Sequence, residues 1–221
     1  MAIVSTHGIN SLPHGAPQPY FPDDRYPDGV MTFTEIPRNN YVMMDRNLDY
    51  KWPDLYIESY GTYPNDVMKL NYPAACYYNF DEDTYGINGR DYGLMYNKSA
   101  VDYLREHPEI FGPADSHGYR WHIPLQNELN AFMYGLNGLN AKSTTYWITP
   151  GTNSSGLNIK PSGTVDTTEF SADDNVARFP YYDQSYYYQC FLPNNGSFTF
   201  TSWGRSGSQD NLINIRLIKH I

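Results

Sequence analysis

The sequence has little cysteine, few charged residues and no long hydrophobic run. Among its 221 residues, Cys76 and Cys190 are the two cysteines, and their separation gives no metal-binding spacing. They either pair across the fold or remain as two buried thiols. No run approaches the roughly 18 apolar residues of a membrane-spanning helix, so we expect no membrane span. The first residues also lack the basic start and apolar segment of a secretory signal. We therefore expect a chain made without export rather than one whose signal has been removed.

Basic residues are outnumbered as well. The 15 Lys and Arg residues stand against 24 Asp and Glu residues, and the net charge is -9. Binding to nucleic acid is therefore disfavoured, because neutralising phosphates requires clustered basic side chains. Charged residues make up only 18% of the chain, whereas tyrosine alone occurs 22 times. This composition is typical of a β- and loop-rich protein with an aromatic core, and it argues against a disordered chain.

Residues 1–29 are rich in proline and glycine and form a segment of their own. Repeated proline removes backbone donors and fixes φ, so neither a regular helix nor a central strand is expected here. A disordered tail and an extended arm that lies on a partner both fit this pattern. The apolar residues favour the arm, because a solvated tail gains nothing from them; they are Ile3, Val4, Tyr20 and Phe21. We therefore divide the chain into an N-terminal arm, 1–29, and a domain, 30–221.

The domain sequence predicts strands, then two helices, then more strands. Expected strands are 30–36, 40–44, 144–149, 185–192, 197–203 and 211–218, the helices are 97–107 and 124–136, and long loops cover about 150–170 and 171–184. The turn residues Pro193-Asn194-Asn195-Gly196 predict a hairpin. Because the strands and helices are segregated along the chain, the fold class is expected to be α+β.

The second helix has the clearest sequence pattern. Pro124 suits the first position of a helix, where its missing N–H costs nothing. The apolar residues that follow share one helical face, and they are Leu125, Leu129, Phe132, Met133 and Leu136. Asn137-Gly138 supplies residues that commonly stop a helix. We expect Trp121, Pro124 and Leu129 to define the fold around this strand-to-helix junction.

Four segments, in this order, resemble one known family. They are NYVMMDRNL (40–48), YGLMYNKSA (92–100), WHIPLQNEL (121–129) and NIRLIK (214–219). They are similar to the W-M-x-x-N-L, Y-G-x-L-Y-x-W-x-x-A, G-W-H-V-P-T-x-x-E-W and S-V-R-C-V-K motifs of the Fibrobacter-type major paralogous domain, a relative of the C-type lectin-like fold. The chain departs from the family at Ser116-His117-Gly118-Tyr119, where Cys-Pro often stands, at Arg120, where Gly is usual, and at Leu217, where Cys is usual.

The resemblance implies a C-type lectin-like domain with two helices, mostly antiparallel short strands and long loops. In such a domain the N-terminal and C-terminal strands pair, and the late loops form a variable face. The family is best known for binding and display, and the resemblance brings no general set of catalytic residues. A distant enzyme branch of the formylglycine-generating type uses a reactive thiol pair, so Cys76 and Cys190 keep that alternative open.

The sequence does not complete a metal site or a catalytic motif. The acidic run 81–83 with Gly86 breaks the Ca²⁺-loop spacing at its fifth position, Tyr85. His117 and His122 lack an evident third zinc ligand. No serine or cysteine stands in a nucleophile motif beside a histidine and an acid. We therefore expect no metal, no cofactor and no catalytic residue.

Tyrosines cluster near the late strands, and tyrosine with Ser, Gly and Asn is typical of adaptable binding loops. Tyr186 and Tyr188 share a strand face with Cys190 and Leu192, so we expect them in the core. The residues expected to face a ligand are Tyr181, Tyr182, Tyr187, Trp203 and Arg205.

These observations predict a non-enzymatic virion structural protein, a phage head or tail fibre or a capsid decoration. Its arm would attach to the capsid or another virion protein. Its domain would face outward toward a host surface receptor or glycan. We expect a homo-oligomer, with a trimer favoured, at the virion surface. One alternative is a bacterial adhesin, located at the cell surface or secreted. The other is an enzyme of the formylglycine-generating type.

Overall fold

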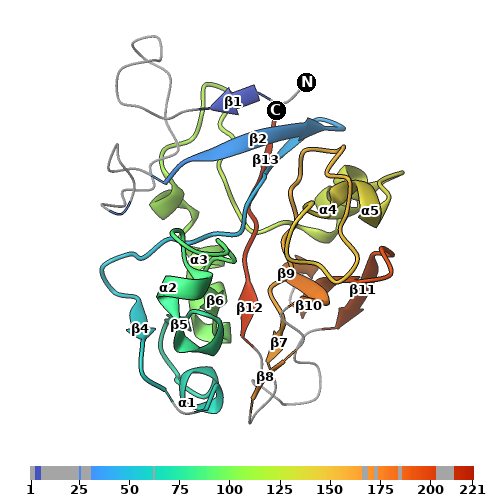
Figure 1. Ribbon diagram of the computed structural model, residues 1–221. Helices are drawn as coiled ribbons and strands as arrows, with labels where there is room; N and C mark the ends of the chain where they lie inside the picture. The colour runs from blue at the N-terminus through green and yellow to red at the C-terminus, as the bar shows by residue number, and fades with distance from the viewer. Residues whose placement is uncertain are drawn as a thin grey trace.

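The computed structural model describes most of the domain and four residues of the predicted arm (Figure 1). The described residues are 3–5, 25, 31–61, 63–165, 169–171, 174–183, 186–202 and 212–221. Tyr20, Phe21, Trp203 and Arg205 lie outside them, as do the side chains of Ile3 and Val4. The described elements are short helices and several mainly antiparallel sheets, in agreement with the α+β class.

The first sheet brings an early strand against the last one. Its order is β1 (Ile3–Ser5), β2 (Phe33–Arg38), β3 (Tyr41–Met44) and β13 (Ile218–His220), all antiparallel. Asn39 and Asn40 form the β2–β3 turn with positive φ, which asparagine tolerates better than most residues. The pairing of β3 with β13 is the pairing that the family resemblance implied. The first three described residues of the predicted arm lie on this sheet as its edge strand.

The second sheet also ends with a C-terminal strand. Its order is β12 (Ile213–Asn214), β6 (Met95–Tyr96), β5 (Ala74–Cys76) and β4 (Tyr56–Glu58), with β4 parallel to β5. Three helices pack around this sheet: α1 (Asn65–Met68), α2 (Glu82–Tyr85) and α3 (Lys98–Glu106). A 3₁₀ turn follows β5 at Tyr78–Phe80, and another follows α3 at Pro108–Phe111. Asn97 caps α3 and Pro108 follows its end, so the first predicted helix is confirmed.

The third sheet contains β9 (Val176–Asp183), β10 (Tyr186–Pro193) and β11 (Thr199–Ser202). The predicted hairpin joins β10 to β11, and the Gly196 N–H donates to the Pro193 carbonyl over 3.0 Å. The strand β9 replaces the loop predicted at 171–184, because it pairs with β10 along its whole length. A small sheet of β7 (Thr164–Val165) and β8 (Phe170–Ser171) lies beside it.

Two other strand predictions are wrong. The segment 144–149 bends instead, with Tyr146 at φ 69° and the Trp147 indole N–H donating to the Ile159 carbonyl over 2.8 Å. The predicted strand 211–218 divides into β12 and β13. Residues 215–217 lie between them, in the middle of the protein, where they cross from the second sheet to the first (Figure 1).

The second predicted helix begins later and ends earlier than expected. Helix α4 (Gln126–Met133) has Leu125 as its N-cap, with Pro124 one position before it rather than at the first helical turn. The Glu128 carboxylate accepts from the Leu125 N–H over 2.9 Å, and this bond fixes the start. Gly135 has φ 69° just after the helix, while Asn137 caps the following α5 (Gly138–Ala141) instead of stopping α4.

The buried side chains form three clusters. Trp121 lies in the first with 3% exposure, and Leu129 lies in the second fully buried, in keeping with their predicted roles. The third surrounds Cys76. The last described segment enters all three: Leu212 joins the third cluster, Ile213, Ile215 and Leu217 join the first, and Ile218 joins the second.

His122 connects the last strand to α4, because its backbone exchanges hydrogen bonds with Ile218 of β13 over 3.0 and 2.9 Å and its side chain contacts Glu128. Its Nδ1 lies 2.8 Å from the Arg120 carbonyl oxygen and its Nε2 lies 2.8 Å from Glu128 Oε2. Both partners accept hydrogen bonds, so both ring nitrogens must carry a proton. Burial acts to lower the pKa of His122, but the hydrogen bond and charge of Glu128 outweigh it, and the pKa is raised above 6.5.

This geometry predicts that the protein loses stability on the alkaline side. The contribution of His122 is fully present below about pH 6.5 and is lost as the pH rises through the raised pKa of the folded state. The free energy of unfolding, measured by urea denaturation across this range, should fall with pH in the native chain and fall less in His122→Gln. His117→Gln is the control, because it removes an exposed histidine and leaves the His122–Glu128 contact in place. Identical slopes in the native chain and His122→Gln would contradict this role.

Candidate binding surface

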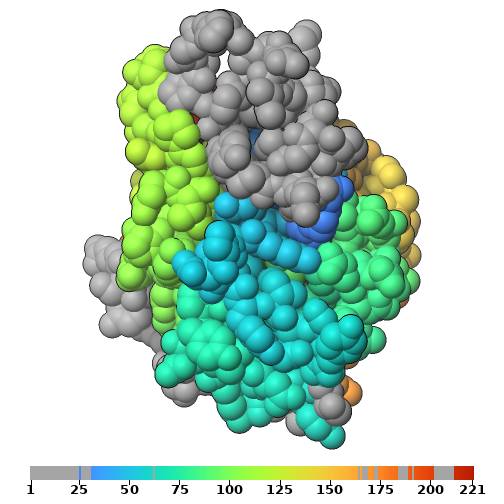
Figure 2. Space-filling view, turned by 90° about the vertical axis from the view of Figure 1, so that its left-hand side faces the viewer, coloured from blue at the N-terminus to red at the C-terminus, as the bar shows by residue number. Residues whose placement is uncertain are grey.

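Four tyrosines project from one end of the second sheet. Their exposed fractions are 94% for Tyr60, 54% for Tyr63, 45% for Tyr72 and 43% for Tyr56. They belong to β4, the loop before α1 and the turn before β5, and we call them the tyrosine surface. Figure 2 shows this segment, coloured cyan to teal, on the lower half of the face that it presents. Exposed aromatic side chains that lie close together mark interaction sites more often than isolated ones do, and the rings of Tyr56 and Tyr72 are in contact.

The strand β4 fixes the position of the tyrosine surface. It pairs in parallel with β5 from Tyr56 to Glu58, while Ile57 points inward and packs against the first buried cluster. The rings of Tyr56 and Tyr72 meet edge to face, with centroids 5.9 Å apart and planes at 83°. This contact links the strand to the turn before β5, so two of the four rings hold each other in place.

Glu58 organises the centre of the surface. One carboxylate oxygen accepts from the Tyr56 hydroxyl over 2.8 Å, and the other accepts from the Tyr60 N–H over 3.0 Å. These bonds lower the pKa of Glu58 below its ordinary value, and the one from Tyr56 contributes most. Glu58 is therefore ionised at neutral pH, and the surface carries a negative charge beside the Tyr56 hydroxyl.

A buried asparagine holds the turn that carries Tyr72. The Asn97 side-chain amide donates to the carbonyls of Val67, Leu70 and Tyr72 over 3.2, 3.2 and 3.0 Å. Its side-chain oxygen accepts from the N–H groups of Ala74 and Ala100 over 3.1 and 2.9 Å. One fully buried side chain thus caps α3 and fixes the segment between α1 and β5.

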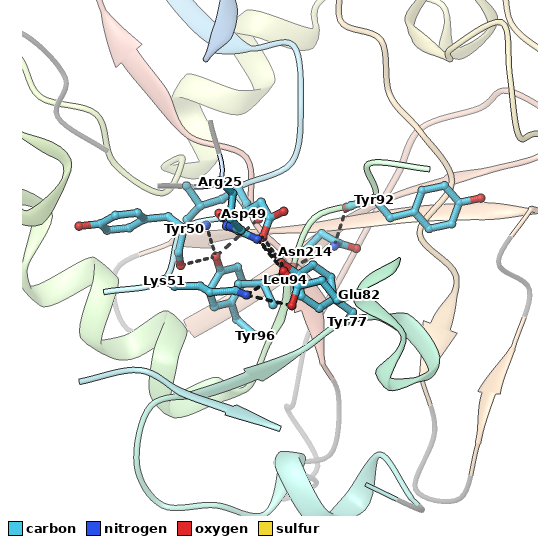
Figure 3. A network of polar contacts seen from close by, with 11 residues as sticks. Arg25, Asp49, Tyr50, Lys51, Tyr77, Glu82, Tyr92, Leu94, Tyr96 and Asn214 are labelled. Carbon is cyan, nitrogen blue, oxygen red and sulfur yellow. Dashed lines mark hydrogen bonds and ion pairs between the residues drawn. The ribbon is translucent and has the colours of Figure 1, made fainter. Parts of the chain in front are cut away.

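Arg25 ties the predicted arm to the domain. Its guanidinium donates to Asp49 Oδ1 and Glu82 Oε1, each over 3.2 Å, and to the Asp49 carbonyl over 2.6 Å. The Tyr77 hydroxyl contacts Arg25 and lies 2.8 Å from Asp49 Oδ1, while Lys51 approaches Glu82 over 2.9 Å (Figure 3). Burial raises the pKa of Asp49, and Arg25 and Tyr77 oppose that rise.

This network joins Arg25 to three separate segments of the domain. Its two carboxylates already face two cations and a hydroxyl group. In the part of the chain that the structure describes, no group of three His, Cys, Asp or Glu residues could hold a metal ion. The acidic run beside it has structural roles as well, since Asp81 caps α2 by accepting from the Thr84 N–H over 2.9 Å.

Among the residues predicted to face a ligand, the structure describes the side chains of Tyr181 and Tyr182. Tyr181 is 2% exposed and packs in the second buried cluster, so its predicted exposure is wrong. On β9 it shares the inward face with Ala177 and Phe179, because side chains alternate along a strand. Tyr182 is half-buried, with the Arg105 guanidinium carbon 6.0 Å from its ring centroid.

The other predicted ligand-facing side chains are outside the described residues. The backbone of Tyr187 pairs with that of Tyr182, but the Tyr187 side chain is not among those described. Trp203 and Arg205 lie wholly outside the described residues. Sequence reasoning missed the tyrosine surface itself. The available signal was the spacing of tyrosines among Gly, Ser and Asn from 56 to 72, in a passage without regular periodicity.

The two cysteines are both free and both fully buried. They belong to different buried clusters, Cys76 to the third and Cys190 to the second. Burial raises the pKa of each thiol, whereas reactive thiols have a lowered pKa and some exposure. The geometry thus gives no support to a thiol-dependent reaction.

Comparisons with known proteins add no relative. No protein family, no curated protein and no solved structure matches this chain. Among the described helices, none has the length and apolar character needed to span a bilayer.

Proposed function

We propose that this chain is a non-enzymatic virion structural protein, a phage head or tail fibre or a capsid decoration. Its domain is of C-type lectin-like type, attached to the particle by the arm and exposing a binding face to a host surface receptor or glycan. One observation carries the proposal. Strand β1 and the C-terminal Ile221 lie at one end of the molecule, and β4 and α1 lie at the other (Figure 1). Attachment at the first end would leave the tyrosine surface pointing away from the particle.

The Arg25 network supports the same arrangement. A domain displayed on an arm keeps a defined orientation only if the junction between them is fixed. Arg25 fixes it through bonds to Asp49, Tyr77 and Glu82 from three separate segments of the domain. The C-type lectin-like type is supported by the pairing of β3 with β13, with α3 and α4 between them in the chain.

The proposal predicts that the arm is required for attachment to particles. The chain should co-purify with virus particles, and deletion of residues 1–24 should abolish that association. This deletion retains Arg25 but removes β1 from the edge of the first sheet, so the circular dichroism spectrum must show that the rest of the domain is still folded. Deletion of residues 1–28 also removes Arg25 and should lower the unfolding midpoint as well as abolish attachment. We expect a homotrimer on the particle, which sedimentation of the purified chain tests.

Other results would favour the other classes of protein. Capsid, portal or tail genes beside the gene for this chain would support the virion protein, and their absence would count against it. Association with cell envelopes instead of particles would indicate a bacterial adhesin. Turnover lost on replacing Cys76 or Cys190 with alanine would indicate an enzyme.

A further inference from the structure

We infer that the tyrosine surface binds a basic, extended peptide segment of a partner protein. The inference rests on the proposed display function and deepens it, because it names the kind of partner that the outward-facing surface recognises. Three features of the described residues carry it: unbalanced negative charge, exposed aromatic rings and the edge of a sheet.

The negative charge at this surface has no partner within the described residues. Residues 54–73 contain three acids, Asp54, Glu58 and Asp66, and one basic residue, Lys69. None of the three acids forms an ion pair in the described part of the chain, and Asp54 and Asp66 are exposed. Elsewhere, acids such as Asp49, Asp91 and Asp102 face arginine or lysine, as Figure 3 shows for Asp49. A cationic ligand would supply the missing charge, whereas an anionic one would be repelled.

The exposed tyrosine rings also favour a cationic ligand. A guanidinium or ammonium group is attracted to the face of a tyrosine ring within about 6 Å of its centroid. The chain already uses this contact internally, since the Arg90 guanidinium carbon lies 5.3 Å from the Tyr85 centroid and 5.9 Å from that of Tyr92. On the tyrosine surface, Glu58 accepts one bond at each carboxylate oxygen, so each oxygen retains capacity for another donor.

The sheet edge favours an extended peptide over a compact ligand. Strand β4 is the outermost described strand of its sheet and pairs there with β5 alone. Tyr56 and Glu58 are two residues apart and therefore project from the same face of β4. A peptide added beside β4 gains main-chain hydrogen bonds, and its alternate side chains reach the ring and the carboxylate together. Arginine or lysine at those alternate positions satisfies both.

The test uses the full chain and two short fluorescein-labelled peptides, one alternating arginine with threonine and one alternating glutamate with threonine. Fluorescence anisotropy should show binding of the arginine peptide and none of the glutamate peptide. Tyr60→Ala and Glu58→Gln should each weaken binding of the arginine peptide by about tenfold. Raising the salt concentration should weaken binding further, because the contact is charged and exposed.

Two matched controls separate a site from general attraction to an acidic protein. Tyr134 is 80% exposed and lies at the end of α4, so Tyr134→Ala removes another largely exposed ring from elsewhere on the molecule. Glu106→Gln removes the same charge as Glu58→Gln from an exposed position on α3. Both controls should bind the arginine peptide within twofold of the native chain. Each variant's circular dichroism spectrum and unfolding midpoint confirm that it is folded.

The binding and attachment measurements together distinguish failure of the inference from failure of the proposed function. Equal weakening by the controls and the site variants would overturn the inference, as would tight binding that survives Tyr60→Ala and Glu58→Gln. Failure of the native chain to bind the arginine peptide while it still attaches to particles overturns the inference alone. Peptide binding without attachment to particles overturns the proposed function alone.

Discussion

Replacing Arg216 with methionine is expected to lower the free energy of unfolding by about 3–5 kcal/mol. Arg216 is fully buried between β12 and β13. Its Nε donates to Asn47 Oδ1 over 2.9 Å, and its other nitrogens donate to the carbonyls of Met44, Leu157 and Asn158 over 3.1, 2.7 and 3.3 Å. Methionine fills much of the volume but leaves these four acceptors without their donor. Urea denaturation of the native and variant chains measures the loss.

Burial lowers the pKa of Arg216 to about 10, and Asp45 and Asp91 oppose this by attraction. Arg216 nevertheless keeps its charge at neutral pH, so the carbonyls and the nearby acids stabilise a cation that water no longer solvates. Arg216→Lys preserves the charge but lacks the planar guanidinium group with its several donors. The free energy of unfolding of this variant should therefore lie between those of the native chain and the methionine variant. A methionine variant within 1 kcal/mol of the native chain would show that the bonds contribute little net stability.

Replacing Asn97 with alanine is expected to lower the free energy of unfolding by about 3 kcal/mol. Loss of the α3 cap accounts for roughly 1 kcal/mol, and the rest comes from buried carbonyls left without a donor. The same substitution should loosen the turn that carries Tyr72, because the Tyr72 carbonyl bonds directly to Asn97. Hydrogen exchange at residues 67–74 should accelerate more than exchange on β9 and β10.

Asn97→Ser separates the two contributions. Serine retains a cap acceptor for the Ala100 N–H but is too short to reach the carbonyls of Val67, Leu70 and Tyr72. It should recover roughly 1 kcal/mol of the loss and leave the exchange at 67–74 fast. Full recovery with serine would mean that the bonds to the turn do not contribute to stability.

Local chemistry was enough to predict several elements. Asn97 before a run of helix formers, with Pro108 after it, gave both ends of α3 to within a residue. The turn residues 193–196 gave the β10–β11 hairpin. Trp121, just before the patterned helix, and Leu129, on its apolar face, were expected to define the fold, and both are buried. Each of these signals lies within a few residues of the element it specifies.

The errors arose where distant segments decide the outcome. Pro180 interrupts the pattern of β9, yet β9 forms because β10 pairs with it throughout. A regular alternation predicted one strand at 211–218, but the bonds of Arg216 to residues 44, 47, 157 and 158 divide it. With 22 tyrosines, the sequence also does not distinguish the buried Tyr181 from the exposed Tyr60. That distinction depends on which face of β9 and which edge of the second sheet meet solvent.

The route of the last segment has a consequence for folding during synthesis. Leu212, Ile213, Ile215, Leu217 and Ile218 complete all three buried clusters, and β12 and β13 pair with strands more than 100 residues earlier. A growing chain therefore carries three unfinished cores until residues 212–218 leave the ribosome. Folding should be slow, because contacts so distant in sequence form late and close large loops. Nascent chains that end before residue 212 should remain protease-sensitive and bind chaperones, and sensitivity should fall sharply once that segment is added.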